Sequence, residues 1–407
     1  MTQVTTADQS RQTPLHQSPI VWGSAALLLV ALLLVGSAIS VTQGALMLVG
    51  GALGLVLYHA AFGFTSAWRV FILERRGRGL RAQMVLLAVA VVLFFPALSA
   101  GTLFDHPVRG FVSPIGVSVV VGAFMFGIGM QLGGGCASGT LFTAGGGNAR
   151  MVVTLLFFIV GSVLATINFD WWASLPAFQA TSLVELGAGP GIATSLALFA
   201  VIAAVTVWLE RRRHGGLEAA AVPAERRGTA RWLRGPWPLL FGAVALALLN
   251  FATLALSGKP WGITSAFALW GAKGVQALGG DPGQWSYWQQ PGNARALSQS
   301  IWHDINSVMN IGIILGAMMA SALAGRFRPS FKIPLRSLSA CVIGGVLLGY
   351  GARIAFGCNI GAYFSGIASG SLHGWVWMVF AFAGNMVGVK LRPFFFAQPA
   401  RPAVSGC

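Results

Sequence analysis

Charged residues are scarce in this chain of 407 residues: only 9% are Asp, Glu, Lys or Arg, and only ten are acidic. An ordinary soluble domain carries about 25% charged residues. Hydrophobic residues make up 56% of the chain, and its mean hydropathy is +0.74. The shortage of charge therefore excludes a soluble globular protein and predicts an all-α polytopic membrane protein.

Cysteine is also rare. The chain has four cysteines, with no CxxC pair, haem-ligand pair or iron–sulfur motif. This pattern indicates neither a structural zinc site nor a disulfide framework, and we predict no metal and no cofactor. The net charge of +16 is typical of nucleic-acid binding. However, the basic residues fall in short loops beside apolar runs, where orientation in a membrane explains them, so we predict no nucleic-acid partner.

Long apolar runs predict about ten membrane spans, each close to the roughly 20 residues that a bilayer requires. Because backbone groups find no partners in lipid, the spans are expected to be helices. The predicted spans are 21–41, 44–62, 81–100, 114–132 and 150–168, followed by 190–209, 236–256, 300–323, 335–353 and 373–391.

The distribution of Lys and Arg predicts the orientation. If the chain begins in the cytoplasm, 21 of its 26 basic residues lie on the cytoplasmic side. Membrane proteins have this bias, so both termini are predicted to be cytoplasmic. The predicted organisation is a tail at 1–18, a first half at 19–210, a basic cytoplasmic linker at 211–235, a second half at 236–393 that continues from the span at 190–209, and a tail at 394–407.

A glycine-rich motif with a central cysteine occurs twice. Aligning Cys136 with Cys358 also aligns five glycines in each copy. The glycines nearest the cysteines are Gly135 and Gly139 in the first copy, and Gly357 and Gly361 in the second. Glycine lets the backbone bend and approach a ligand closely, so the duplication predicts one site built from two halves. The alternative is close helix packing around two buried, inert thiols.

A second short motif is also repeated. Residues 63–67 and 262–266 share a Gly-x-Thr-Ser-Ala pattern, whose hydroxyl side chains are Thr65 and Ser66 in the first copy and Thr264 and Ser265 in the second. These hydroxyl groups suit hydrogen bonds to the oxygens of an anion; the alternative is helix packing by small residues.

Four segments are too short or too rich in glycine to span a membrane cleanly: 63–72, 136–147, 262–271 and 358–370. The predicted orientation gives the two five-span halves opposite topology. Broken segments at matching positions of such halves predict two inverted repeats, with short helices meeting at a transport site near the middle of the membrane.

The residue types at this site favour an anion. Thiols are soft, polarizable and weak hydrogen-bond donors, and few carboxylates lie near Cys136 and Cys358. Short helices that begin at the cysteines would direct free N–H groups at the ligand. Arg353 precedes Cys358 by five residues and would attract an anion if it points inward. The alternative is that it extends to the outer membrane surface.

The paired cysteine loops and the repeated Thr-Ser motifs resemble those of the YeeE/YedE family of bacterial membrane proteins, from about residue 44 to residue 393. The resemblance implies an hourglass-like inner-membrane thiosulfate permease in which Cys136 and Cys358 match the two central cysteines. In that family, pore thiols are thought to pass the anion along by S–H hydrogen bonds. Some members have another cysteine on the first short element, which this chain lacks, and other relatives are linked to selenium metabolism.

We therefore predict an inner-membrane permease, not an enzyme, that imports a small sulfur oxyanion, with thiosulfate as the first candidate. The first alternative is another sulfur anion or a selenium anion. The second is a membrane enzyme that transfers sulfur or electrons through a Cys136–Cys358 disulfide. The third is a subunit whose basic loops anchor a cytoplasmic sulfur-carrier protein. The expected partners are the anion, the lipid bilayer and such a carrier.

Overall fold

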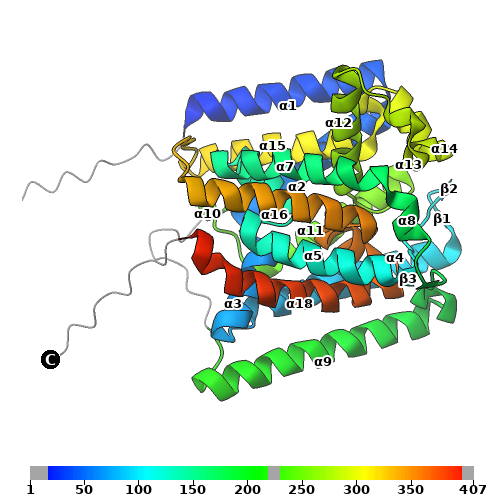
Figure 1. Ribbon diagram of the computed structural model, residues 1–407. Helices are drawn as coiled ribbons and strands as arrows, with labels where there is room; N and C mark the ends of the chain where they lie inside the picture. The colour runs from blue at the N-terminus through cyan, green and yellow to red at the C-terminus, as the bar shows by residue number, and fades with distance from the viewer. Residues whose placement is uncertain (1–16, 219–229, 397–407) are drawn as a thin grey trace, which may run out of the picture.

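Long helices run side by side through the molecule (Figure 1). The computed structural model describes residues 17–218 and 230–396. Within these ranges, ten helical segments are long and apolar enough to cross a membrane, so the predicted all-α, multi-pass class is confirmed. The long helices are α1 (Ser18–Ala38), α2 (Val41–His59), α4 (Arg78–Ala100), α5 (Val117–Gly133), α7 (Ala149–Ile167), α9 (Ala188–His214), α11 (Leu239–Ser257), α15 (Ile305–Leu323), α16 (Leu335–Ile354) and α18 (Leu372–Phe395).

Short helices follow four of the long ones. They are α3 (Phe64–Glu74) after α2, α6 (Ala137–Gly145) after α5, α12 (Thr264–Ala277) after α11, and a π-helical turn, η5 (Asn359–Phe364), with α17 (Ser365–Ala368) after α16. They lie at the four segments that the sequence predicts to be broken. α12 extends six residues beyond its predicted end, because no glycine or proline interrupts the helix between Val275 and Ala277.

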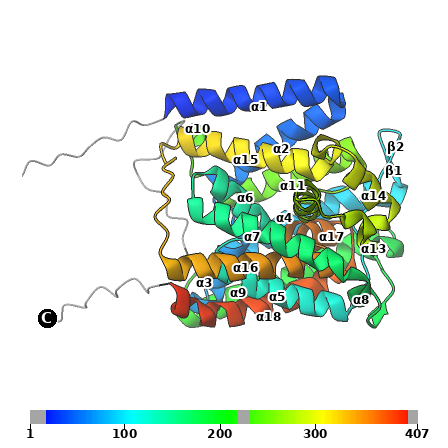
Figure 2. The same cartoon turned by 45° about the horizontal axis from the view of Figure 1, so that its top comes forward.

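The remaining elements gather at one end of the bundle, opposite the end of α18 (Figures 1 and 2). Two small antiparallel sheets pair β1 (Thr102–Leu103) with β2 (His106–Pro107), and β3 (Ile115–Gly116) with β4 (Ala177–Phe178). The short helices here are α8 (Phe169–Ala173), α13 (Ser286–Gln289) and α14 (Pro291–Ser298), with 3₁₀ turns η1 (Leu183–Leu186), η3 (Pro282–Gln284) and η4 (Ile301–His303). α10 (Ala230–Arg234) lies at the other end.

Helix pairs with close backbone contact form the centre. α5 packs against α16 and α18, α7 packs against α16, α2 packs against α15, and α4 packs against α11. A Cβ atom on Gly316 of α15 would overlap the Gly51 carbonyl oxygen of α2, and one on Gly127 of α5 would overlap the Ala381 carbonyl oxygen of α18. Small residues at such contacts let helices associate in lipid, where the hydrophobic effect does not drive them together.

Two helices flank this centre on opposite edges (Figure 1). α1 contacts α2 and α15, and α9 contacts α4. Most residues of both helices are exposed, as expected for surfaces that face lipid. α9 extends to His214, beyond the predicted end at residue 209. Its last turns are fixed because the buried Glu210 carboxylate pairs with Arg81 at 2.6 Å and accepts a hydrogen bond from the Gly77 amide at 3.0 Å.

Most of the predicted tails and the middle of the predicted linker lie outside the described residues, at 1–16, 219–229 and 397–407. Of the linker, residues 211–214 complete α9 and residues 230–234 form α10. α1 begins at the end of the bundle where α18 ends (Figure 2), as an even number of spans requires. The domain boundaries and the inverted relation of the halves stay predictions.

Candidate functional site

Both candidate cysteines occupy the first position of a short helix. Cys136 is the N-cap of α6, and its sulfur accepts the Gly139 amide hydrogen at 3.4 Å. Cys358 is the N-cap of the η5 turn, and its sulfur accepts the Ile360 amide hydrogen at 3.4 Å. Both residues are buried, with exposed fractions of 1% and 0%. The thiols thus have the position that Ser, Thr or Asp has at most helix starts, beside the free N–H groups of the first turn.

The glycines around the cysteines have different roles. Gly357 has φ of +151°, and a Cβ atom there would lie 2.6 Å from the Ala362 nitrogen, so the turn before η5 requires glycine. A Cβ on Gly135 would approach the Thr140 nitrogen to 3.1 Å. Gly139 lies against the Cys136 sulfur, whereas Gly361 faces open space. Close approach of the backbone therefore explains the glycine at positions 135 and 357, whereas a side chain at position 361 would meet open space.

The two cysteine loops meet, because α6 contacts η5. Cys136 also has polar neighbours: the Ser138 hydroxyl lies 3.4 Å from its sulfur, and Thr65 of α3 lies beside it. The Thr65 hydroxyl is buried and has no hydrogen-bond partner among the described residues. Soft sulfur atoms and hydroxyl groups thus share one buried region.

A cavity of about 500 Å³ reaches this region from the end of the bundle that carries α13. We name it the Arg353 cavity. Five predicted site residues line it: Thr264, Ser265, Arg353, Gly357 and Gly361. The Arg353 side chain does not extend away to the surface, because its guanidinium stacks on the Tyr287 ring, at 5.3 Å from the centroid, and donates to the Tyr287 hydroxyl. Ser265 accepts a hydrogen bond from the Asn306 amide.

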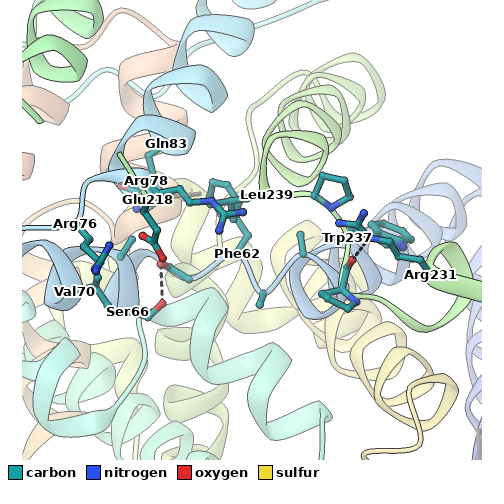
Figure 3. Close-up of a pocket in the computed structure, with 17 residues that line it drawn as sticks. Phe62, Ser66, Val70, Arg76, Arg78, Gln83, Glu218, Arg231, Trp237 and Leu239 are labelled. Carbon is teal, nitrogen blue, oxygen red and sulfur yellow. Dashed lines mark hydrogen bonds between the residues drawn. The ribbon is translucent and has the colours of Figure 1, made fainter. Parts of the chain in front are cut away.

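A second cavity, of about 370 Å³, opens between α3, α4 and the start of α11 (Figure 3). We name it the Ser66 cavity. Ser66 lines it and donates to the Gly63 carbonyl oxygen at 3.1 Å. Three basic residues and one acidic residue also line it: Arg76, Arg78, Arg231 and Glu218. Ser66 and Ser265, which match in the repeated motif, therefore line different cavities, and Thr65 lies between them without lining either.

A layer of buried aromatic side chains contacts Gln83 of the Ser66 cavity. Tyr363 lies two residues after Gly361 and makes edge contacts with Phe64 and Trp68, at centroid distances of 6.0 Å and 5.9 Å. The Tyr363 hydroxyl donates to the Gln83 side chain at 3.4 Å, and the Trp68 indole donates to the same oxygen at 2.9 Å. Gln83 lines the Ser66 cavity. Tyr363 thus links η5, whose Gly361 lines the Arg353 cavity, to Gln83 of the Ser66 cavity.

Three residues of this region were not identified from the sequence: Gln83, Tyr363 and Asn359. Gln83 lies in an apolar span, and a polar residue inside a span is itself a signal of function. Tyr363 is one of only four tyrosines in the chain. Asn359 follows Cys358 directly and is fully buried, and neither its amide nitrogen nor its amide oxygen has a hydrogen-bond partner among the described residues.

Known proteins share this sequence pattern along most of the chain. Residues 59–387 match the model of a family described as sulphur transport. The chain belongs to this family. This chain is 31% identical over 353 residues to the thiosulfate transporter TsuA of Spirochaeta thermophila, and the matched region covers 83% of this chain and 96% of the relative. It is 26% identical over 374 residues to the thiosulfate transporter TsuA of Escherichia coli K12, and that match covers 88% of this chain and 96% of the relative.

A shorter match links this chain to the probable transporter YedE of Escherichia coli K12. The two are 28% identical over 166 residues, and the matched region covers 40% of each chain. The resemblance to the YeeE/YedE family is therefore confirmed. The relatives are named as transporters, in agreement with the prediction of a transporter rather than an enzyme.

Proposed function

We propose that this protein is an inner-membrane permease that imports a small sulfur oxyanion, with thiosulfate as the substrate. The observation that carries the proposal is the meeting of two helix starts capped by Cys136 and Cys358 in one buried region beside the Arg353 cavity. The relatives named as thiosulfate transporters match this chain over most of its length, which supports the choice of anion.

The electrostatics of the site suit an anion. The first-turn N–H groups of α6 and η5 lie at the cysteines and carry partial positive charge. The lining of the Arg353 cavity includes one cation and no carboxylate. A neutral thiol donates a weak S–H hydrogen bond, and its soft sulfur suits the polarizable sulfur end of thiosulfate. Cys136 and Cys358 would hold the anion in turn, with no covalent step.

The basic residues orient the proposed path. With the start of α1 in the cytoplasm, the Arg353 cavity faces the periplasm and the Ser66 cavity faces the cytoplasm. The anion would then enter beside Arg353, pass Cys358, Cys136 and Thr65, and leave beside Ser66. We place the barrier of this path at the buried Tyr363 ring, whose hydroxyl bonds Gln83 of the Ser66 cavity, and this ring would move during each passage.

An inverted repeat would supply this movement, since the two halves could exchange conformations. Matching helix pairs support such a repeat: α5 with α18 corresponds to α16 with α7, and α2 with α15 corresponds to α11 with α4. The flanking helices correspond too, because α1 is the first of the first five spans and α9 is the first of the second five. At the cytoplasmic opening, Arg76, Arg78 and Arg231 would offer a basic surface to an acidic sulfur-carrier protein.

Uptake of labelled thiosulfate tests the proposal. Cells without other thiosulfate and sulfate importers would carry the wild type, Cys136→Ala, Cys358→Ala or the control Cys341→Ala, whose thiol is buried in α16. We expect uptake by the wild type and by the control, and at least a ten-fold loss in the other two variants at equal membrane levels. Normal uptake by Cys136→Ala and Cys358→Ala would refute the thiol path.

The same cells distinguish the alternative anions. If the wild type does not import thiosulfate, uptake of sulfite and selenite would identify another sulfur anion or a selenium anion as the substrate. A reversible Cys136–Cys358 disulfide that is required for activity would replace the permease with a membrane thiol enzyme.

A further inference from the structure

Asn359 is unusual among the buried polar residues of this protein. It is the first residue of the η5 turn, directly after the Cys358 cap, and its exposed fraction is 0%. Neither Nδ2 nor Oδ1 has a hydrogen-bond partner among the described residues. A buried amide without partners is unfavourable, and more than nine in ten buried polar groups in proteins are paired. This amide therefore requires an explanation.

Of the other buried asparagines in the described chain, Asn250 and Asn385 are engaged on both sides of the amide, and Asn310 donates to the Ile263 carbonyl oxygen at 3.1 Å while its Oδ1 has no partner. Asn250 donates to the Ser365 hydroxyl at 3.2 Å and accepts the Trp261 backbone amide hydrogen at 2.8 Å. Asn385 donates to the Ala381 carbonyl oxygen at 2.8 Å and accepts from Gln131 at 2.6 Å. These asparagines hold helices together through their amides. Asn359 makes none of these bonds and has no such structural role.

The corresponding position of the first cysteine loop is Ala137, so the amide is not a general requirement of the motif. The polar neighbours of the two thiols therefore differ. Cys136 has the Ser138 hydroxyl at 3.4 Å and the unpaired Thr65 hydroxyl beside it, whereas Cys358 has the unpaired Asn359 amide next to it in the chain. Each thiol thus lies near one buried polar group whose bonding capacity is unused.

We propose that Asn359 forms an oxyanion subsite: its Nδ2 donates a hydrogen bond to an oxygen of the transported anion while Cys358 holds the sulfur end. This inference rests on the proposed function and adds a specificity residue to it. A neutral amide binds oxygen without adding a charge that would trap the anion. The subsite therefore requires an anion with terminal oxygens and rejects sulfur anions that have none, because these would leave the amide unpaired.

If Asn359 binds the anion and nothing within the protein, its substitution should weaken the affinity for the anion without lowering the stability of the fold. Removing an amide that binds nothing within the protein does not cost stability, whereas removing a paired one does. Asn359→Leu, which is close in shape, should therefore leave the unfolding temperature unchanged or raise it. It should weaken substrate binding, because one hydrogen bond to a charged group contributes about ten-fold or more to affinity.

The experiment compares Asn359→Leu, Asn359→Ser and Asn250→Leu with the wild type. Thermal unfolding would be followed by tryptophan fluorescence in detergent, and initial rates of labelled thiosulfate uptake would be measured in liposomes. We expect KM to rise about ten-fold or more for Asn359→Leu and less for Asn359→Ser, which keeps a donor. Asn250→Leu should lower the unfolding temperature and leave KM unchanged.

An unchanged KM in Asn359→Leu overturns the subsite. So does a lower unfolding temperature, or failure of this variant to reach the membrane, since each would show that the amide is needed for folding. Absence of thiosulfate uptake by the wild type would instead refute the proposed function, so the two failures are distinguishable.

Discussion

At the scale of single residues, sulfur serves as both a helix cap and a candidate ligand. Cys136 and Cys358 each accept an amide hydrogen at 3.4 Å, and sulfur is a weak acceptor. A serine hydroxyl is a better cap than a thiol. Selection for helix stability alone would favour serine at both positions, so the cysteines point to a role in which the soft sulfur matters.

Substitution by serine separates these two roles. We expect Cys136→Ser and Cys358→Ser to keep or slightly raise the unfolding temperature, because the better cap contributes about 0.5–1 kcal/mol. We also expect thiosulfate uptake to fall by at least ten-fold, because a hard hydroxyl replaces the polarizable thiol. Uptake assays and thermal unfolding measure both effects, with Cys341→Ser as the control. Full uptake by both serine variants would show that transport does not require the thiols and that a hydroxyl group is sufficient.

The sequence identified the cysteines, the repeated hydroxyl groups and Arg353 because each of them repeats or stands out along the chain. The structure places Thr264, Ser265 and Arg353 on the Arg353 cavity, and Cys358 lies between two glycines that line it. Asn359 could not be identified in this way. Its unpaired amide is a property of its surroundings, and those depend on the packing of helices far apart in the sequence.

At the scale of helices, the position of α9 depends on one ion pair. Glu210 is fully buried, binds Arg81 at 2.6 Å and accepts backbone hydrogen bonds from Gly77 and Glu218, at 3.0 Å and 2.8 Å. The sequence predicted the span but ended it at residue 209, because Glu210 and the arginines after it read as loop residues. The tertiary ion pair allowed the helix to continue.

Removing one member of this pair should destabilise the protein. We expect Glu210→Ala to lower the free energy of unfolding by about 3 kcal/mol, because Arg81 would lose its partner in a largely buried setting. Glu74→Ala is the matched control, since the Glu74–Arg76 pair is exposed and 3.7 Å long, and we expect a loss below about 1 kcal/mol. Equal losses in chemical denaturation would mean that the Glu210 pair does not hold α9.

The aromatic layer is an assembly of several elements. Tyr363 of η5 contacts Phe64 and Trp68 of α3, and stacks on Trp377 of α18 at 6.5 Å. The sequence could predict that short elements meet but not which rings pack together, because ring contacts follow from side-chain packing. The four rings come from three elements that are far apart in the chain, α3, η5 and α18.

We expect Tyr363→Ala to open a leak for small anions, because the proposed path has its barrier at this buried ring. Liposomes with this variant should lose trapped iodide at least ten-fold faster than liposomes with the wild type. Tyr350→Ala is the control, because Tyr350 bonds Trp172 and Asn168 away from the barrier. Equal iodide loss from both variants would place the barrier elsewhere.

At the scale of the whole molecule, the orientation in the membrane is open to a direct test. Gln284 lies in the segment with α13, and Ser330 lies between α15 and α16 at the opposite end. We expect a membrane-impermeant thiol reagent applied to whole cells to label Gln284→Cys and not Ser330→Cys, because the basic residues favour the cytoplasm for the second site. Labelling of Ser330→Cys alone would reverse the direction of the proposed path.

The near-complete burial of Cys136 and Cys358 has a consequence for the resistance of the protein to oxidation. A thiol in open water outside the inner membrane meets oxidants that convert it to sulfenic acid and then to products that cannot be reversed. Exposure and thiolate character determine how fast this damage occurs. Burial of both sulfurs within the protein would let the proposed thiol pathway persist beside an oxidising compartment.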